Sequence, residues 1–360
     1  MFAGIDTHKD TLAVGVVDVI GRSLAAVELP NTRAGFVSIA ALLAHHRVER
    51  VGIEGSGNYG RCIAAYLVLD WTPDQPVEVC EVPTLMTSRE RRSHPSKGKT
   101  DPVDALAIAR ITGREKSLPP VRLAVGDAAD LRALLDYRDD LVMERTAVSN
   151  RAHSDLHGLF PGYQTQIINL TGQANLTRAL ELVGADERVR AEITRRRLER
   201  MIAIDQEVAT LKRRIAGRVA DTGSTLTGIH GMGPLTAARF LAEIVDITRY
   251  PNRNTFAAVN GTAPLAASSG RTSRHRFNPG GNRKLNRCLY IIAITQIRGD
   301  TEGKVYYKRK REAGKSKREA IRCLKRRMSD IVYATMRRDL AGVGAADATQ
   351  ARQTANRPAA

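Results

Sequence analysis

The stretch from Lys99 to Ala105 contains two aspartates, Asp101 and Asp104, at a spacing that could support chemistry. Pro102 suits the first turn of a helix, and residues three apart on a helix lie on the same face. Two carboxylates held this close repel each other unless a cation lies between them. An aspartate cap followed by a first-turn acid has the same pattern, so this stretch alone leaves both interpretations open.

The segments before this stretch indicate how further carboxylates could join it. Apolar and β-branched residues predict five strands, over Phe2–Asp6, Thr11–Asp18, Arg22–Leu29, Val51–Glu54 and Val77–Val82. Helices are expected from Thr32 to about His45, from after Gly57 to Leu69, and from Asp101 onward. Three meandering strands followed by alternating helix and strand is the order of an α/β ribonuclease-H-like domain, in which the first and fourth strands are neighbours.

In that fold, four carboxylates from distant segments would meet, namely Asp6, Glu54, Asp101 and Asp104. Their repulsion and desolvation would be unfavourable without a metal ion. Ligand sets made only of oxygen favour Mg²⁺, with Mn²⁺ as an alternative. Two such ions about 4 Å apart could promote phosphodiester cleavage. The sequence therefore predicts that these four residues are both metal ligands and catalytic residues.

The charge of the chain points to a polyanionic partner. The 56 Lys+Arg against 38 Asp+Glu give a formal net charge of +18, and residues 1–112 are almost neutral, so the excess lies in the remainder. The four cysteines have no metal-ligand or disulfide spacing, and no apolar run approaches the length of a membrane span. Acidic residues directly after the N-terminus do not fit a signal peptide, so a cytoplasmic location is expected.

Three motifs resemble the DEDD-type transposases of the insertion sequence 110 family, which are similar to Piv-type DNA invertases. The motifs match in order and spacing, and they are Gly4-Ile5-Asp6-Thr7-His8-Lys9-Asp10, Ile53-Glu54-Gly55-Ser56-Gly57-Asn58-Tyr59 and Lys99-Thr100-Asp101-Pro102-Val103-Asp104-Ala105. The resemblance covers roughly residues 2–112 and 224–340. It implies a RuvC-like catalytic domain that acts on donor and target double-stranded DNA.

The same resemblance implies a second, C-terminal transposase domain with a nucleophilic serine directly before a glycine. That position is Ser269 here, and Ser268 is the adjacent alternative. The family usually has Gly-Leu-x-Pro where this chain has Gly261-Thr262-Ala263-Pro264, a minor departure. The resemblance further implies a covalent serine–DNA linkage, a composite site in a homo-oligomer (a dimer or tetramer), and a structured guide RNA encoded by the element. By chemistry alone, Ser-Ser-Gly is an ordinary loop.

Several basic residues could contact a phosphate backbone, although basic segments are often merely solvated. A polar loop before Asp101 and a stretch after Ser269 supply nine of them, Arg89, Arg91, Arg92, Lys97, Lys99, Arg271, Arg274, Arg276 and Lys284. The run Lys304–Arg327 has 12 basic and 2 acidic residues and includes Lys308, Arg309, Lys310 and Arg311. It is expected to bind nucleic acid with a strong dependence on salt.

Two long amphipathic helices are predicted between these regions. Leu131, Leu141 and Leu156 mark the first, and Ile204, Val208, Leu211 and Ile215 give the second a coiled-coil-like seam. Gly231 and Gly233 then resemble a helix-hairpin-helix turn that could hold a phosphate, or they could simply permit a tight turn. The predicted organisation is a catalytic domain (1–115), a helical coiled-coil arm (116–222), a mainly α C-terminal domain (223–340) and a disordered tail (341–360).

Three alternatives to a serine-dependent recombinase stay open at this point. A RuvC-like resolvase would use metal-bound water instead of Ser269. A sugar-kinase-like phosphotransferase would share the Gly4-Ile5-Asp6 strand but would need a duplicated second domain. A non-catalytic nucleic-acid scaffold would not explain why the four carboxylates occur in this order.

Overall fold

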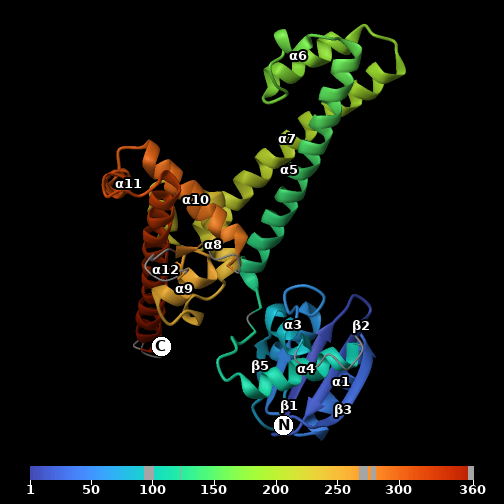
Figure 1. The fold of residues 1–360 in the computed structure, drawn as a ribbon, viewed down its shortest axis with the longest axis vertical. Coiled ribbons are helices and arrows are strands. Elements are labelled where there is room, and N and C mark those ends of the chain that lie inside the picture. Colours follow the sequence, from blue (N-terminus) through green and yellow to red (C-terminus); the bar gives the residue numbers. More distant parts are fainter. Residues whose placement is uncertain (93–100, 122, 267–274, 277–280, 356–360) are drawn as a thin grey trace, which may run out of the picture. The chain divides into compact units, whose positions relative to one another are not determined.

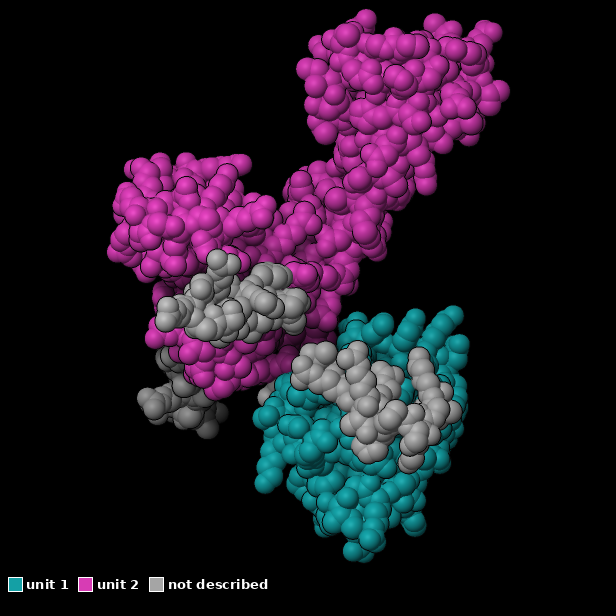
Figure 2. All heavy atoms as spheres, in the orientation of Figure 1, with its two compact units in different colours: residues 1–123 teal, residues 124–360 magenta. Residues whose placement is uncertain are grey.

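The computed structural model describes residues 1–92, 101–121, 123–266, 275–276 and 281–355 (Figure 1). The chain divides into two compact units, residues 1–123 and residues 124–360 (Figure 2). Unit 1 contains a mixed β-sheet with helices, and unit 2 is mainly helical. Within the described residues, no helix has an apolar run long enough to cross a membrane.

Unit 1 is built on a five-stranded sheet with the order β3-β2-β1-β4-β5. The strands are β1 (Phe2–Thr7), β2 (Thr11–Val17), β3 (Ser23–Pro30), β4 (Arg50–Ile53) and β5 (Glu78–Glu81). The helices are α1 (Arg33–His45), α2 (Arg61–Ala65), a π-turn (Tyr66–Asp70), α3 (Thr84–Arg92) and α4 (Asp101–Arg114). β1 pairs antiparallel with β2 and parallel with β4. The predicted mixed sheet with adjacent first and fourth strands is therefore confirmed, and it is consistent with a ribonuclease-H-like fold.

A row of three glycines crosses the sheet, because Gly4 of β1 pairs with Gly15 of β2 and with Gly52 of β4. Helix α4 lies directly on this row. A Cβ atom on Gly4 would be 2.3 Å from the backbone nitrogen of Ala109, and one on Gly52 would be 1.9 Å from Oγ1 of Thr112. The glycines thus permit a close approach of α4 to the sheet, and this approach brings the first turn of α4 to the end of β1.

Gly4→Ala is expected to lower the free energy of unfolding of unit 1 by about 3 kcal/mol, because the added methyl group would meet backbone atoms that cannot move aside. Trp71 is the only tryptophan and packs against the core of unit 1, so its fluorescence in urea measures this unfolding in the full chain. Gly57→Ala is the matched control, since nothing lies within 4 Å of the Cβ position there. Equal stabilities of the two variants would contradict the close packing of α4.

Arg50 holds the other end of α4. The residue is 8% exposed, and its guanidinium group donates hydrogen bonds to the carbonyl oxygens of Thr112 (2.9 Å), Glu115 (2.6 Å) and Lys116 (3.4 Å). These bonds satisfy carbonyl groups that have no partner within the helix. Arg50 also pairs with Glu78 of β5 at 2.8 Å. The position of α4 on the sheet is thus fixed at its C-terminus as well as along the glycine row.

Unit 2 contains eight described α-helices and a two-stranded sheet. The helices are α5 (Gly126–Leu159), α6 (Gln173–Gly184), α7 (Val189–Asp221), α8 (Pro234–Ile244), α9 (Arg253–Val259), α10 (Arg283–Arg298), α11 (Glu302–Glu312) and α12 (Lys317–Ala355). Short 3₁₀ turns lie at Tyr163–Thr165, Thr225–Gly228 and Ile247–Arg249, and the strands are β6 (Leu265–Ala266) and β7 (His275–Arg276). Helices α8, α10 and α12 contribute to one apolar core around Phe240, Leu289 and Leu324.

The two longest helices before α8, α5 and α7, pack side by side and run in opposite directions (Figure 1). Leu141 of α5 is buried with Ile204, Val208 and Leu211 of α7, so the predicted apolar seam faces the partner helix. Ion pairs such as Arg145–Asp205 at 2.9 Å join the polar edges of the two helices. Helix α6 covers one end of the pair through a separate apolar cluster.

Two segments differ from the sequence prediction. Arg89, Arg91 and Arg92 belong to helix α3 rather than to a polar loop, and Glu90 of α3 pairs with Arg114 of α4 at 3.0 Å. Helix α12 continues to Ala355, although a disordered tail was expected from residue 341. The first segment was interpreted from its polar composition and the tail from its Ala/Gly/Gln-rich composition. Both interpretations gave too little weight to helix propensity, which is high for Arg, Glu and Ala.

Candidate active site

Four carboxylates come from three elements of unit 1 that meet at one edge of the sheet. Asp6 lies near the end of β1, and Glu54 directly follows β4. The backbone nitrogen of Glu54 donates to the carbonyl oxygen of Ile5 at 3.1 Å, so Glu54 continues the strand pairing beside Asp6. Asp101 and Asp104 lie in the first turn of α4. The helix dipole favours acids there, so the same turn is stable and can serve as a cation site.

The ionisation of Asp6 is affected by burial and by the charges around it. Burial raises the pKa of Asp6 above its ordinary value, and the charges of Glu54, Asp104 and Asp101 raise it further, while His8 opposes the rise. The Asp104 side chain is almost fully buried, with 4% of the residue exposed. Of the four carboxylates that the sequence singled out, Asp6 and Asp101 lie in one cluster with His8, and Glu54 and Asp104 are near enough to Asp6 to act on its charge.

The donor atoms of this cluster fit a divalent metal ion. One ligand atom each from Asp6, His8 and Asp101 lies within 4.8 Å of the other two. Nε2 of His8 is 3.4 Å from Oδ2 of Asp6 and 3.4 Å from Oδ1 of Asp101. Carboxylate oxygens are the ligands that Mg²⁺ and Mn²⁺ prefer, and a bound cation would remove the repulsion that raises the pKa of Asp6.

Hydrogen bonds from neighbouring polar residues fix the two loops that border the cluster. Asn31, directly after β3, donates through Nδ2 to the carbonyl oxygens of His8 (3.0 Å) and Tyr59 (3.1 Å). Oγ1 of Thr7 donates to the carbonyl oxygen of Glu54 at 2.9 Å. These bonds tie the β1–β2 turn to the loop after β4, and they position His8 relative to Glu54 without any metal ion.

His8 and Asn31 were not among the predicted site residues. The alternation of side chains along a strand could have indicated His8, because residues two apart, such as Asp6 and His8, face the same side. Asn31 gave no comparable signal. The sequence suggested a helix cap at Asn31-Thr32, and the side chain that accepts from the start of α1 is that of Thr32.

The predicted nucleophile and several predicted basic contacts lie outside the described residues. These are Ser268, Ser269, Lys97, Lys99, Arg271 and Arg274. The two serines fall in the sequence between β6 and β7, which pair antiparallel, and Arg276 belongs to β7 opposite Leu265. The roles of the two serines and of these basic residues stay predictions.

The segment just before β6 rests on a buried polar network. Nδ2 of Asn286 donates to the carbonyl oxygens of Asn260 (2.9 Å) and Gly261 (3.1 Å), and Nζ of Lys325 donates to Oδ1 of Asn286 at 2.5 Å. The Asn260 amide donates in turn to Oγ of Ser329 at 2.8 Å. Burial lowers the pKa of Lys325 to about 8. The backbone that leads toward the predicted serine is thus firmly held.

Three further predicted nucleic-acid contacts of unit 2 are Lys284, Gly231 and Gly233. Lys284 is committed to ion pairs, with Nζ 3.0 Å from Asp136 and 3.5 Å from Glu243. Gly231 has φ of +89°, and a Cβ there would lie 3.0 Å from Thr295, so its tight turn and packing explain the glycine. Gly233 precedes α8, and its surroundings are open.

Helix α11 carries a group of exposed cations. Lys308, Arg309 and Arg311 are exposed and Lys310 is partly exposed. Cationic groups of Arg309, Lys310 and Arg327 lie 5.3–5.4 Å from the centre of the Tyr306 ring, which orders part of the group through cation–π contacts.

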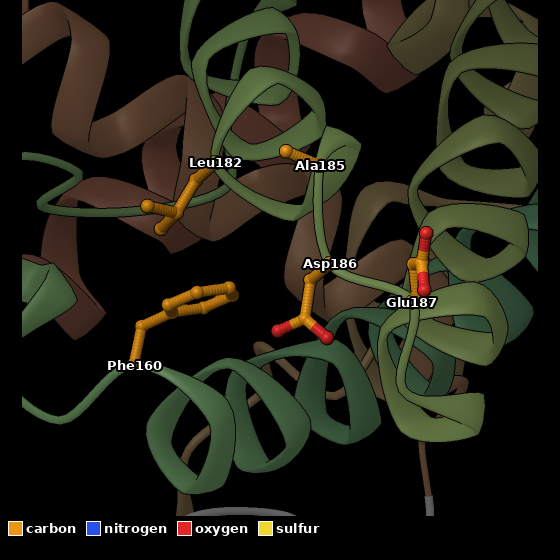
Figure 3. A pocket seen from close by; sticks show the side chains of 5 residues that line it. All are labelled: Phe160, Leu182, Ala185, Asp186 and Glu187. Atoms are coloured by element: carbon orange, nitrogen blue, oxygen red, sulfur yellow. The ribbon is translucent and has the colours of Figure 1, made fainter.

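A surface hollow of about 520 Å³ lies near the end of the α5–α7 pair, lined by Phe160, Leu182, Ala185, Asp186 and Glu187 (Figure 3). The carboxylate of Asp186 binds Arg188, whose guanidinium group also lies 5.8 Å from the Phe160 ring. Asp186 is thus engaged in an ion pair at the edge of the hollow.

A carboxylate cluster of this kind on a mixed sheet, followed by a basic helical region, defines a DEDD-type enzyme that processes nucleic acids. Residues 3–161 match the family model of DEDD transposases of the IS110 type, and residues 223–308 match the model described as "Transposase IS116/IS110/IS902 family". The chain belongs to the IS110 family of transposases. It is therefore an enzyme of DNA transposition and recombination, and the DEDD domain with its acidic cluster indicates use of a divalent metal ion.

Curated proteins of insertion elements are similar over most of the chain. The chain is 24% identical to the 44.8 kDa protein of insertion element IS116 from Streptomyces clavuligerus, over 94% of each chain. It is 28% identical to the 42 kDa protein of IS900 from Mycobacterium paratuberculosis, over 68% of this chain and 73% of the relative. The transposase for IS1111A from Coxiella burnetii is 24% identical, over 74% and 69%. These matches favour the transposase interpretation over a sugar-kinase-like phosphotransferase.

Proposed function

We propose that this transposase cleaves and rejoins DNA strands in a metal-dependent reaction that uses Ser269 as the nucleophile. The observation that carries the proposal is the cluster of Asp6 and Asp101 with His8, in which burial and the charges of Glu54, Asp104 and Asp101 raise the pKa of Asp6. Such a cluster is poorly suited to a purely structural role, because mutual repulsion destabilises it unless a cation is bound. Family membership supports DNA as the substrate.

The four carboxylates would hold Mg²⁺ or Mn²⁺, with two ions expected from the number of ligands. A bound metal ion would polarise the scissile phosphate and stabilise its developing negative charge. Oγ of Ser269 would form the new bond to phosphorus while the bond from phosphorus to a DNA oxygen breaks. The serine hydroxyl loses its proton, and the released DNA hydroxyl takes up a proton. Basic residues near the serine would stabilise the charged transition state.

Removal of divalent metal is expected to lower strand cleavage by at least about 100-fold, the size of effect that accompanies loss of a group that stabilises transition-state charge. The measurement uses the full-length protein with DNA that carries the ends of its element, together with any RNA the element encodes. Cleavage is compared in EDTA and after Mg²⁺ or Mn²⁺ is restored. Equal cleavage in EDTA would contradict metal dependence.

The proposed nucleic-acid surface of unit 2 centres on α11. Replacing Lys308, Arg309, Lys310 and Arg311 with glutamine is expected to reduce the slope of log K against log salt by about 3–4, since each lost phosphate contact removes about one unit. The measurement is DNA binding by fluorescence anisotropy at several salt concentrations. A variant that exchanges each Lys for Arg and each Arg for Lys keeps the charge and should keep the slope. An unchanged slope in the glutamine variant would show that these side chains are only solvated.

The resemblance to the family further supports a homo-oligomer with a structured guide RNA as partner. The antiparallel α5–α7 pair is the proposed coiled-coil arm, and the segments after it form the proposed C-terminal transposase domain, with Gly231 and Gly233 in a helix-hairpin-helix-like turn. The arm would bring protomers together, so that the carboxylates of one protomer could act with Ser269 of another.

A further inference from the structure

The imidazole of His8 lies beside the carboxylates Asp6 and Asp101. Its Nε2 lies 3.4 Å from one oxygen of Asp6 and 3.4 Å from one oxygen of Asp101. Although the side chain as a whole is 45% exposed, this nitrogen atom is buried and makes no hydrogen bond within the described residues. The ring is thus partly exposed, while Nε2 itself lies inside the cluster.

The backbone holds His8 in this position independently of the cluster. The backbone nitrogen of His8 donates to the carbonyl oxygen of Thr11 at 3.0 Å, which closes the β1–β2 turn. The carbonyl oxygen of His8 accepts from Nδ2 of Asn31 at 3.0 Å. Because both backbone groups are bonded, the backbone of His8 is fixed beside the cluster before any ion binds.

The three possible metal ligands, Asp6, His8 and Asp101, come from three different segments of unit 1. Asp6 comes from β1, His8 from the turn after it and Asp101 from the first turn of α4, and their ligand atoms all lie within 4.8 Å of one another. Small shifts of side chains could place all three on one ion. Asp6 and Asp101 would supply oxygen donors to the ion, and His8 would supply one nitrogen donor.

We propose that Nε2 of His8 is a direct ligand of a divalent ion in this cluster, and that it gives this site a preference for Mn²⁺ over Mg²⁺. The inference rests on the proposed metal dependence. Mg²⁺ strongly favours oxygen ligands, whereas transition metals also accept imidazole nitrogen. An all-carboxylate site would have no comparable reason to select Mn²⁺. The alternative is that His8 only orients Asp6 and Asp101 through ion pairs.

Pulsed electron paramagnetic resonance of Mn²⁺ bound to the full-length protein separates the two roles without measuring activity. A directly bound imidazole should give a nitrogen coupling to Mn²⁺ in the wild type. The coupling should vanish in His8→Ala and persist in His45→Ala, which changes an exposed histidine at the end of α1. Trp71 fluorescence checks that each variant is folded. The wild-type spectrum tests the proposal even if a variant does not fold.

Metal affinities provide the second measurement. The ratio of the Kd for Mg²⁺ to the Kd for Mn²⁺ should fall by about tenfold in His8→Asp, because an oxygen ligand replaces nitrogen. Wild-type binding of Mn²⁺ without a nitrogen coupling would overturn the role of His8 and leave the carboxylate site intact. A coupling that persists in His8→Ala would also overturn it. Failure of the wild type to bind either ion would overturn the metal-dependent function together with this inference.

Discussion

Replacing Asp101 with asparagine, or Glu54 with glutamine, is expected to reduce strand cleavage by at least about 100-fold. Each change removes one negative charge from a cluster whose proposed purpose is to bind a divalent ion. Asp101 and Glu54 come from different elements, the start of α4 and the end of β4, so equal losses would not reflect damage to one loop. DNA affinity should change by less than about twofold, because the proposed phosphate contacts lie mainly elsewhere.

The measurement compares cleavage rates and DNA affinities of the two variants at equal Mg²⁺ and salt concentrations. Asp10→Asn is the matched control, since it removes an exposed carboxylate from the same turn as His8 and leaves the cluster unchanged. Titration with Mn²⁺ should show weaker metal binding in both cluster variants. If either variant cleaves DNA at the wild-type rate, the residue that it replaces is not a ligand of the metal ion.

Much of the catalytic unit could be predicted because its strands are short, apolar and separated by clear turn residues. β1, β2 and β3 each lie within about a residue of the predicted ranges, and the parallel pairing of β1 with β4 follows from the order of elements. Asp6 and Glu54 could then be placed side by side, since carboxylates at the ends of adjacent parallel strands share one edge of the sheet.

Other features depend on contacts between distant residues, which local patterns do not contain. Each of Gly4, Gly15 and Gly52 looks like an ordinary strand glycine, and only their pairing across three strands reveals the surface on which α4 rests. The same is true of Asn31, whose bonds to His8 and Tyr59 join two loops. The ion pairs of Lys284 with Asp136 and Glu243 likewise join residues that are distant in the sequence.

The nature of the nucleophile separates the proposed recombinase from a RuvC-like resolvase that uses metal-bound water. If the hydroxyl of Ser269 attacks phosphorus, protein and DNA become joined through a phosphoserine. Reactions stopped with denaturant should then contain protein that stays attached to a labelled DNA strand. A resolvase would give cleaved DNA without such an adduct, and it would tolerate the loss of Ser269.

Ser269→Ala is therefore expected to abolish both the adduct and the cleaved strand, with a loss of at least about 1,000-fold, as for removal of an essential nucleophile. Ser268→Ala is the matched control and should retain the adduct, because the family resemblance places the attacking hydroxyl directly before Gly270. Both variants should bind Mn²⁺ as the wild type does, since Ser269 does not belong to the carboxylate cluster. Mass spectrometry of the digested adduct identifies the modified serine. Normal nicking by Ser269→Ala without an adduct would instead establish water as the nucleophile, and nicking with an adduct would move the attacking hydroxyl to Ser268.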